Sequence, residues 1–141
     1  MTRHVFEYAL LRVVPRVERG EMVNAGVIVY CRAVDYLGAR VHLDAARLHA
    51  IDPGADHEAI ARVLDAVAGV CAVAEAPRSD RRTDGALAAV GPAAGEDIGR
   101  RFRRLTAPRS TVVQPGPVHT GLTTDPAAEA DRLLRELVLP L

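Results

Sequence analysis

The sequence predicts one α+β domain over residues 1–141, in which a mainly antiparallel sheet starts with an N-terminal β-hairpin and packs against a mid-chain helix and a C-terminal helix. Three observations lead to this prediction. Two apolar runs near the N-terminus are joined by a short polar connector that contains a turn glycine. Apolar residues then recur with a period of about 3.6 in mid-chain. They do so again near the C-terminus, as on amphipathic helices.

Strands are expected in the N-terminal third of the chain. Val5 to Val14 and Met22 to Arg32 are rich in branched and aromatic residues, and a hairpin through Gly20 is the economical link between them. A third strand is expected over Gly38 to Leu43. Strict alternation along the second strand would place Val23, Ala25, Val27, Val29 and Cys31 on one face and Asn24, Gly26, Ile28 and Tyr30 on the other. Both faces are mostly apolar, which indicates that both are covered.

Two amphipathic helices are expected. The mid-chain stripe is made up of Ile60, Val63, Leu64, Val67, Val70 and Cys71. Either Asp52 or Asp56 is expected to cap that helix. Asp125 followed by Pro126 marks the start of the terminal helix, because Asp caps helices and Pro fits their first turn. The buried stripe of the terminal helix is expected to be Ala130, Leu133, Leu134, Leu137 and Val138.

The chain between the two amphipathic helices is less regular. Residues 76–95 are rich in Pro, Gly, Ala, Arg and Asp, which predicts a flexible surface loop rather than a linker between two domains. Ile98 to Leu105 is expected to form a short helix. Ser110 to Gln114 is expected to form a fourth strand, because Thr and Val favour the pleated surface.

The composition excludes several classes of protein. All 18 basic residues are Arg, so no lysine is present to form a Schiff base or to complete a P-loop. The net charge is zero, and no apolar run reaches the roughly 18 residues that span a bilayer. Nucleic acid and membrane are therefore not expected partners of the chain as a whole. Cys31 and Cys71 form no C-x-x-C motif, which indicates reduced thiols and a cytoplasmic protein.

No metal site and no cofactor are expected. His42, His49 and His57 lie among three aspartates, at the connection between the strands and the mid-chain helix. His57 is followed by Glu58, but position 61 is Ala61, so the H-E-x-x-H motif of zinc proteases is not completed. Scattered His and Asp residues of this kind are typical of a solvated surface.

Two polar segments carry the residue types that a binding site needs. Arg109 offers a planar guanidinium that suits phosphate or carboxylate, and neutral donors follow it closely. The expected binding residues are Arg109, Ser110, Thr111, Gln114, His119 and Thr120 in one segment and Arg19, Glu21 and Asn24 in the hairpin. In an enzyme, His119 and Glu21 would be the acid–base groups. A shared site requires the two segments to meet in space.

Other interpretations of these residues stay open. Ser110 and Thr111 with His119 resemble a nucleophile and a base, but no G-x-S-x-G motif and no acidic partner accompany them, which disfavours covalent catalysis. Asn24 is unusual within a strand, where an amide satisfied by neighbouring backbone is the simpler explanation. Arg100, Arg101, Arg103 and Arg104 form a basic cluster beside Phe102. That cluster is either a nucleic-acid surface or a solvated helix face that contacts an acidic partner.

Three segments carry a family resemblance. Arg19 to Val29 combines an R-G-E turn with a V-N-x-G-V strand, and Leu105 to Gln114 contains A-P-R-S-T. V-H-T-G-L follows at Val118 to Leu122, and a D-P-x-x-x-x-x-D-R-L-L-x-x-L pattern runs from Asp125 to Leu137. These segments resemble the bacterial family called domain of unknown function 3037, over a span from about Phe6 to Val138. The resemblance brings no established activity and implies a partner or modulator of a HipA-like kinase.

Three functions are expected in order of preference. The first is a small cytoplasmic binding or accessory partner of another protein, because no catalytic motif is present. The second is an enzyme or sensor for a small molecule that bears phosphate or carboxylate, with Arg109 as the anion clamp and His119 as the acid–base group. The third is nucleic-acid binding through Arg100 to Arg104.

Overall fold

A computed structural model describes residues 2–75 and 96–141, so the loop expected over residues 76–95 lies outside the described residues. The N-terminal half contains β1 (His4–Val13), β2 (Val23–Cys31), the short 3-10 turn η1 (Arg32–Val34), β3 (Tyr36–Val41), α1 (Ala45–Ile51) and α2 (His57–Glu75). The C-terminal part contains α3 (Ile98–Leu105), β4 (Val113–Pro115), β5 (His119–Thr123) and α4 (Pro126–Leu137). The expected α+β class is confirmed.

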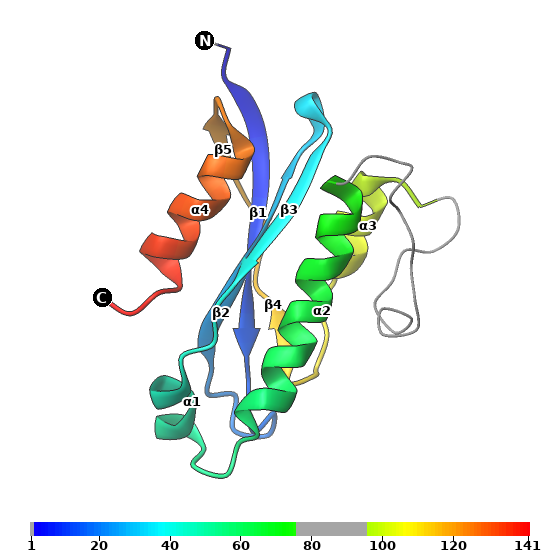
Figure 1. The fold of residues 1–141 in the computed structure, drawn as a ribbon. Helices are drawn as coiled ribbons and strands as arrows, with labels where there is room; N and C mark the ends of the chain where they lie inside the picture. Colours follow the sequence, from blue (N-terminus) through cyan, green and yellow to red (C-terminus); the bar gives the residue numbers. More distant parts are fainter. Residues whose placement is uncertain (1, 76–95) are drawn as a thin grey trace.

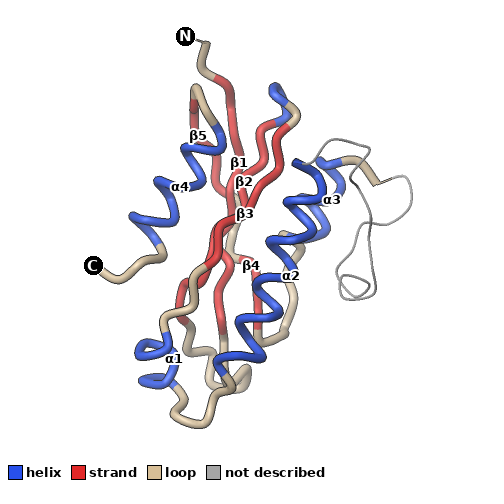
Figure 2. Tube along the Cα trace, viewed as in Figure 1, coloured by secondary structure: helices blue, strands red, loops and turns tan. Residues whose placement is uncertain are grey.

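The sheet is antiparallel and has the order β3-β2-β1-β4, with β5 also paired to β1 (Figure 2). The N-terminal hairpin joins β1 to β2, as predicted. The edge of β1 that faces away from β2 is shared by two short strands. β4 pairs with Leu11 to Val13, and β5 pairs with His4 to Tyr8. β4 and β5 therefore act as one interrupted edge strand.

Helices cover both faces of the sheet (Figure 1). α2 and α3 lie on one face, and α4 lies on the other. Phe102, Leu64 and Val70 are fully buried in the larger core between the sheet and α2 and α3. Ala130 and Leu133 of α4 pack on a smaller core on the opposite face. Both helices predicted from the apolar stripes are thus present, but they contact opposite faces.

The strict alternation expected along β2 is wrong. Leu11 lies opposite Gly26 and Arg12 lies opposite Asn24, so Ala25 is an extra residue in β2. Such a bulge shifts the phase of side chains along the strand by one residue. Val23, Ala25, Ile28 and Tyr30 consequently lie in the core beneath α2 and α3, whereas Val27, Val29 and Cys31 lie in the core beneath α4.

Several boundaries also differ from the sequence prediction. The fourth strand starts at Val113 rather than Ser110, because the Thr111 hydroxyl donates to the Val113 carbonyl and holds the preceding residues in a bend. Asp56, not Asp52, caps α2 by accepting from the amide of Ala59. The helix α1 and the strand β5 were not predicted. Val63 and Leu137, expected in buried stripes, are exposed.

Candidate binding surfaces

The A-P-R-S-T segment lies beside α2 and the C-terminal end of α3. Arg109 donates from Nη2 to the carbonyl of Arg104 over 2.7 Å, a contact that suits the negative end of a helix dipole. Ser110 and Thr111 are exposed. A shallow hollow of about 420 Å³ separates this segment from α2, and its α2 wall is apolar, formed by Ala59, Ile60, Val63 and Val67. Arg109 therefore supports α3 at the rim of a mainly apolar hollow.

His119 and Gln114 lie on the opposite face of the sheet, the face that α4 covers in part. The His119 ring lies 5.2 Å from the ring of Tyr8, which stacks on Phe6 and packs against the core beneath α4. Gln114 lies opposite Arg12 in the sheet. Because cross-strand partners point to the same face, the sheet separates His119 and Gln114 from Arg109.

The hairpin residues are partnered locally. Arg19 and Glu21 form an exposed ion pair with each other in the turn between β1 and β2. Asn24 donates from Nδ2 to the carbonyl of Leu137 over 3.1 Å, which ties β2 to the end of α4. The amide is thus satisfied by backbone, the simpler of the two explanations for an Asn in this strand.

The nine expected binding residues do not gather at one place. Asn24 and Gln114 flank Arg12 from the two neighbouring strands and form one polar row with it. Thr120 lies opposite Glu7, on the face that carries α3. The remaining residues lie in the hairpin turn, beside α2, or against Tyr8, as described above. A single site built from the hairpin and the 107–122 segment is therefore not formed.

The basic cluster on α3 is compensated by carboxylates. Arg101 and Arg104 both contact Glu96, at 3.2 and 2.8 Å, and the Arg101 and Glu96 side chains are only 5% and 8% exposed. Hydrogen bonding from Arg104 is the main cause that holds the pKa of Glu96 below its ordinary value, against the opposing effect of burial. The cluster thus contains a buried structural ion pair.

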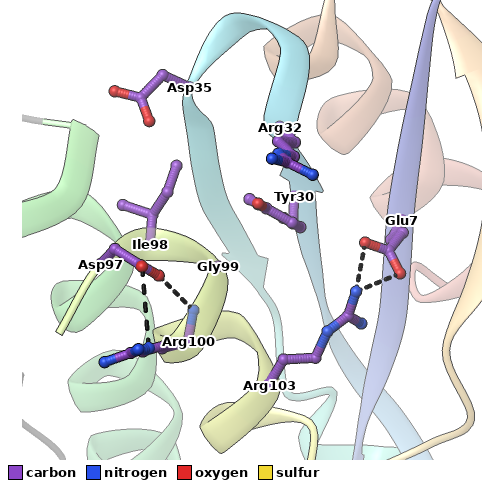
Figure 3. A pocket seen from close by; sticks show the side chains of 9 residues that line it. All are labelled: Glu7, Tyr30, Arg32, Asp35, Asp97, Ile98, Gly99, Arg100 and Arg103. Carbon is purple, nitrogen blue, oxygen red and sulfur yellow. Dashed lines mark hydrogen bonds and ion pairs between the residues drawn. The ribbon is translucent and has the colours of Figure 1, made fainter.

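The other two arginines of the cluster also face acids (Figure 3). Arg103 donates to both carboxylate oxygens of Glu7, at 2.8 and 2.9 Å. Arg100 lies 4.0 Å from Asp97. Phosphate-backbone recognition depends on cations that are free to replace counterions, and these four are already paired. A nucleic-acid surface on α3 would have to break these pairs, and it stays a prediction.

β5 presents an unprotected sheet edge. Among the described residues β5 pairs only with β1, so alternate backbone groups on its outer side lack a strand partner. Natural edge strands are usually shielded by charge, proline or a bulge. Pro115 and Pro117 shield the neighbourhood of β4, but the five residues of β5 (H-T-G-L-T) include neither proline nor an Asp, Glu, Lys or Arg.

Two exposed apolar side chains adjoin this edge. Val5 and Leu122 are directly opposite each other on β1 and β5, and they are 61% and 59% exposed. A hollow of about 580 Å³ opens next to Val5 and is lined by Arg3, His4 and Arg32 among other residues. Glu7 also lines it but is held by Arg103. Because Glu7 is paired with Arg103, Arg3 and Arg32 give this hollow a net positive charge. Sequence reasoning missed this surface, since an edge is defined only by the pairing of strands.

These features define a small α+β protein with an open sheet edge and with the arginines of α3 paired to carboxylates. The chain belongs to the family described as "Protein of unknown function (DUF3037)", whose profile matches residues 8–138. The resemblance carried by the R-G-E and A-P-R-S-T segments is thereby confirmed over nearly the whole chain. No curated protein and no solved structure gives a match.

Among residues 2–75 and 96–141, no three His, Cys, Asp or Glu side chains come together as metal ligands would. None of the described helices has the length and apolarity needed to cross a membrane.

Proposed function

We propose that this protein is an accessory protein that binds another protein, and that β5 is the strand to which the partner adds. One observation carries this proposal: β5 is an unprotected edge strand with the exposed Val5–Leu122 pair beside it. Added strands gain affinity from backbone hydrogen bonds and specificity from alternate side chains. Both contributions are available along β5.

The charge next to the edge supports a proposal about the chemistry of the partner. Arg3 and Arg32 leave the hollow beside Val5 with net positive charge, because Glu7 is already bound by Arg103. An extended segment with apolar residues for Val5 and Leu122 and a carboxylate for Arg3 would complement this surface. A HipA-like kinase, the partner that the family resemblance implies, is the first protein to test for such a segment.

A second copy of this chain complements the surface less well. β5 carries no carboxylate, so self-pairing through this edge would bring no acid from the strand to the positive hollow. We therefore expect a hetero-complex rather than a strand-paired homodimer.

The proposal is tested with the tagged full-length chain purified from its host. Leu122→Lys places a charge on the edge, and it should reduce recovery of the partner at least about tenfold while leaving the fold intact, because the side chain is mostly exposed. Val17→Lys is the matched control, since Val17 is also exposed but lies in the β1–β2 turn. A photo-crosslinking residue in place of Thr120 should attach to an extended, acidic segment of the partner.

Three outcomes would overturn the proposal. The first is recovery of a monomer alone from the host, and the second is a homodimer that Leu122→Lys disrupts. The third is a partner that Leu122→Lys and Val17→Lys retain equally well, which would locate binding elsewhere. Nucleic-acid binding stays a prediction of its own, and Arg100 to Arg104 would then give affinity that falls steeply with salt.

A further inference from the structure

We propose that the hollow between the β2–β3 connection and the first turn of α3 binds a small phosphorylated ligand that also carries hydroxyl groups. This hollow has a volume of about 800 Å³, within the range of small-molecule sites. Figure 3 shows Tyr30 and Arg32 on one side of it and Ile98, Gly99 and Arg100 on the other. This hollow shares Glu7, Tyr30 and Arg32 with the hollow beside Val5, but it extends to the first turn of α3 and does not include the β5 strand.

Tyr30 is the first indication of a ligand. Its side chain is held in place by the Phe102 ring, whose centroid lies 5.2 Å away, and the residue is only 9% exposed. The hydroxyl nevertheless points into the hollow and has no hydrogen-bond partner among the described residues. The ring is buried but the hydroxyl faces the hollow, so it is positioned to hydrogen-bond to a ligand that enters.

Gly99 makes room for that hydroxyl. A Cβ atom at position 99 would lie 2.9 Å from the Tyr30 oxygen, closer than such atoms approach. The glycine therefore lets the hydroxyl reach the first turn of α3. Ile98 and Gly99 are the first two residues of this helix, so their amides have no partner within it. The hydroxyl therefore lies beside the first turn of α3, at the positive end of its helix dipole.

The acids that line the hollow are already engaged. Glu7 accepts two hydrogen bonds from Arg103, and Asp97 accepts from the amide of Arg100 over 2.7 Å. Arg32 has no ion-pair partner among the described residues. The unsatisfied groups are thus mainly donors: the Arg32 guanidinium, the Tyr30 hydroxyl and the two amides. A phosphate group, with several acceptor oxygens and negative charge, matches this set.

The Asp35 carboxylate indicates that the ligand also carries hydroxyl groups, which can donate hydrogen bonds to it. Asp35 lines the same hollow, and its carboxylate has no ion pair within the described part of the chain. Its backbone is held in the left-handed region with φ of 53°. A carboxylate at this position accepts hydrogen bonds from a polyol but repels phosphate. The ligand is therefore a phosphate ester of a polyol, as in a sugar phosphate or a nucleotide, and not phosphate alone.

The test uses the purified full-length chain with ribose 5-phosphate as the probe. Calorimetry should show saturable binding, and the amide resonances of Ile98 and Gly99 should shift downfield. Ribose should not bind, and inorganic phosphate should bind more weakly by about tenfold or more. Absence of saturable ribose 5-phosphate binding would overturn the proposal. Equal affinity for inorganic phosphate would overturn the role of Asp35.

Paired variants separate this site from the rest of the surface. Tyr30→Phe keeps the ring on Phe102 and should weaken binding about tenfold, whereas Tyr8→Phe should not. Arg32→Gln should weaken binding at least tenfold, whereas Arg62→Gln on α2 should leave it unchanged. If Tyr30→Phe and Arg32→Gln bind like the unaltered protein, the site is wrong. Leu122→Lys should bind ribose 5-phosphate normally, so that failure of one proposal does not affect the other.

Discussion

At the scale of single residues, Glu96 has a structural role at the start of α3. It accepts hydrogen bonds from two arginines of α3, and one of them, Arg101, is buried with it. Arg101 also lies 3.5 Å from the carbonyl of Val70, so this group connects α3 to α2. A buried cation in such a position depends on its counter-charge.

Glu96→Gln should therefore destabilise the protein by about 3–5 kcal/mol, because it leaves the Arg101 guanidinium buried without a negative partner. Urea unfolding monitored by circular dichroism measures this loss. Glu136→Gln is the control: it breaks an exposed pair with Arg132 and should cost less than about 1 kcal/mol. Equal effects of the two substitutions would mean that Glu96 is solvated like a surface residue.

The pH dependence of stability gives a second readout of the same group. Because hydrogen bonding from Arg104 lowers the pKa of Glu96 in the folded state, its contribution is complete above the ordinary carboxyl pKa. It should be lost as the pH falls below 4.5 and through the lowered folded-state pKa. In Glu96→Gln, the loss of unfolding free energy over this pH range should be smaller by the contribution of Glu96. Identical acid profiles would show that other carboxylates cause it.

The partners of the basic cluster could not be predicted from the sequence. Arg103 binds Glu7, which is 96 residues away along the chain. Arg101 and Arg104 share one acid at the border of a segment without periodicity. Local patterns report which side chains are charged, but pairing at such separations depends on how strands and helices pack. For the same reason, the sequence could not reveal that Arg109, His119, Glu21 and Asn24 lie apart in the fold.

At the scale of elements, periodicity predicted most of the fold. The hairpin, the mid-chain helix, Ile98 to Leu105 and the Asp125–Pro126 helix start all appear where the pattern placed them. The pattern failed at the Ala25 bulge, because both phases of β2 are apolar and one inserted residue leaves no trace in composition. It also failed at β5, a short strand of mixed polarity that is defined by its partner β1.

The pairing of β5 with β1 supports a further prediction. Gly121 lies opposite Phe6, and a Cβ atom there would come within 2.7 Å of the buried Phe6 ring. Gly121→Ala should destabilise the protein by about 1–3 kcal/mol, because the ring must shift within a packed core. Thermal unfolding measures this effect. Gly54→Ala is the control, since its nearest neighbour would be 3.5 Å away. Should both variants be equally stable, β5 is not held against Phe6 as described.

At the scale of the whole molecule, the sheet divides the protein into two unequal cores. The core beneath α2 and α3 holds most of the large buried side chains, including Phe102, Leu48 and Leu64. α4 contributes only Ala130 and Leu133 to the other buried cluster, with Asn24 and Arg40 adding polar contacts to it. Elements with less buried apolar area open at lower free energy than the rest of a protein. α4 is therefore expected to separate from the sheet before global unfolding.

Two matched core substitutions test this division. Leu64→Ala in α2 and Leu133→Ala in α4 each remove one well-buried leucine, a change that costs about 2–5 kcal/mol in a packed core. Native-state hydrogen exchange should reveal different consequences. Leu64→Ala should reduce protection throughout the sheet, because the larger core opens only with the whole molecule. Leu133→Ala should accelerate exchange in α4 and leave β1 and β2 protected to nearly the original degree. If Leu133→Ala instead lowers protection uniformly, the two cores unfold as one unit and α4 is integral to the stability of the sheet.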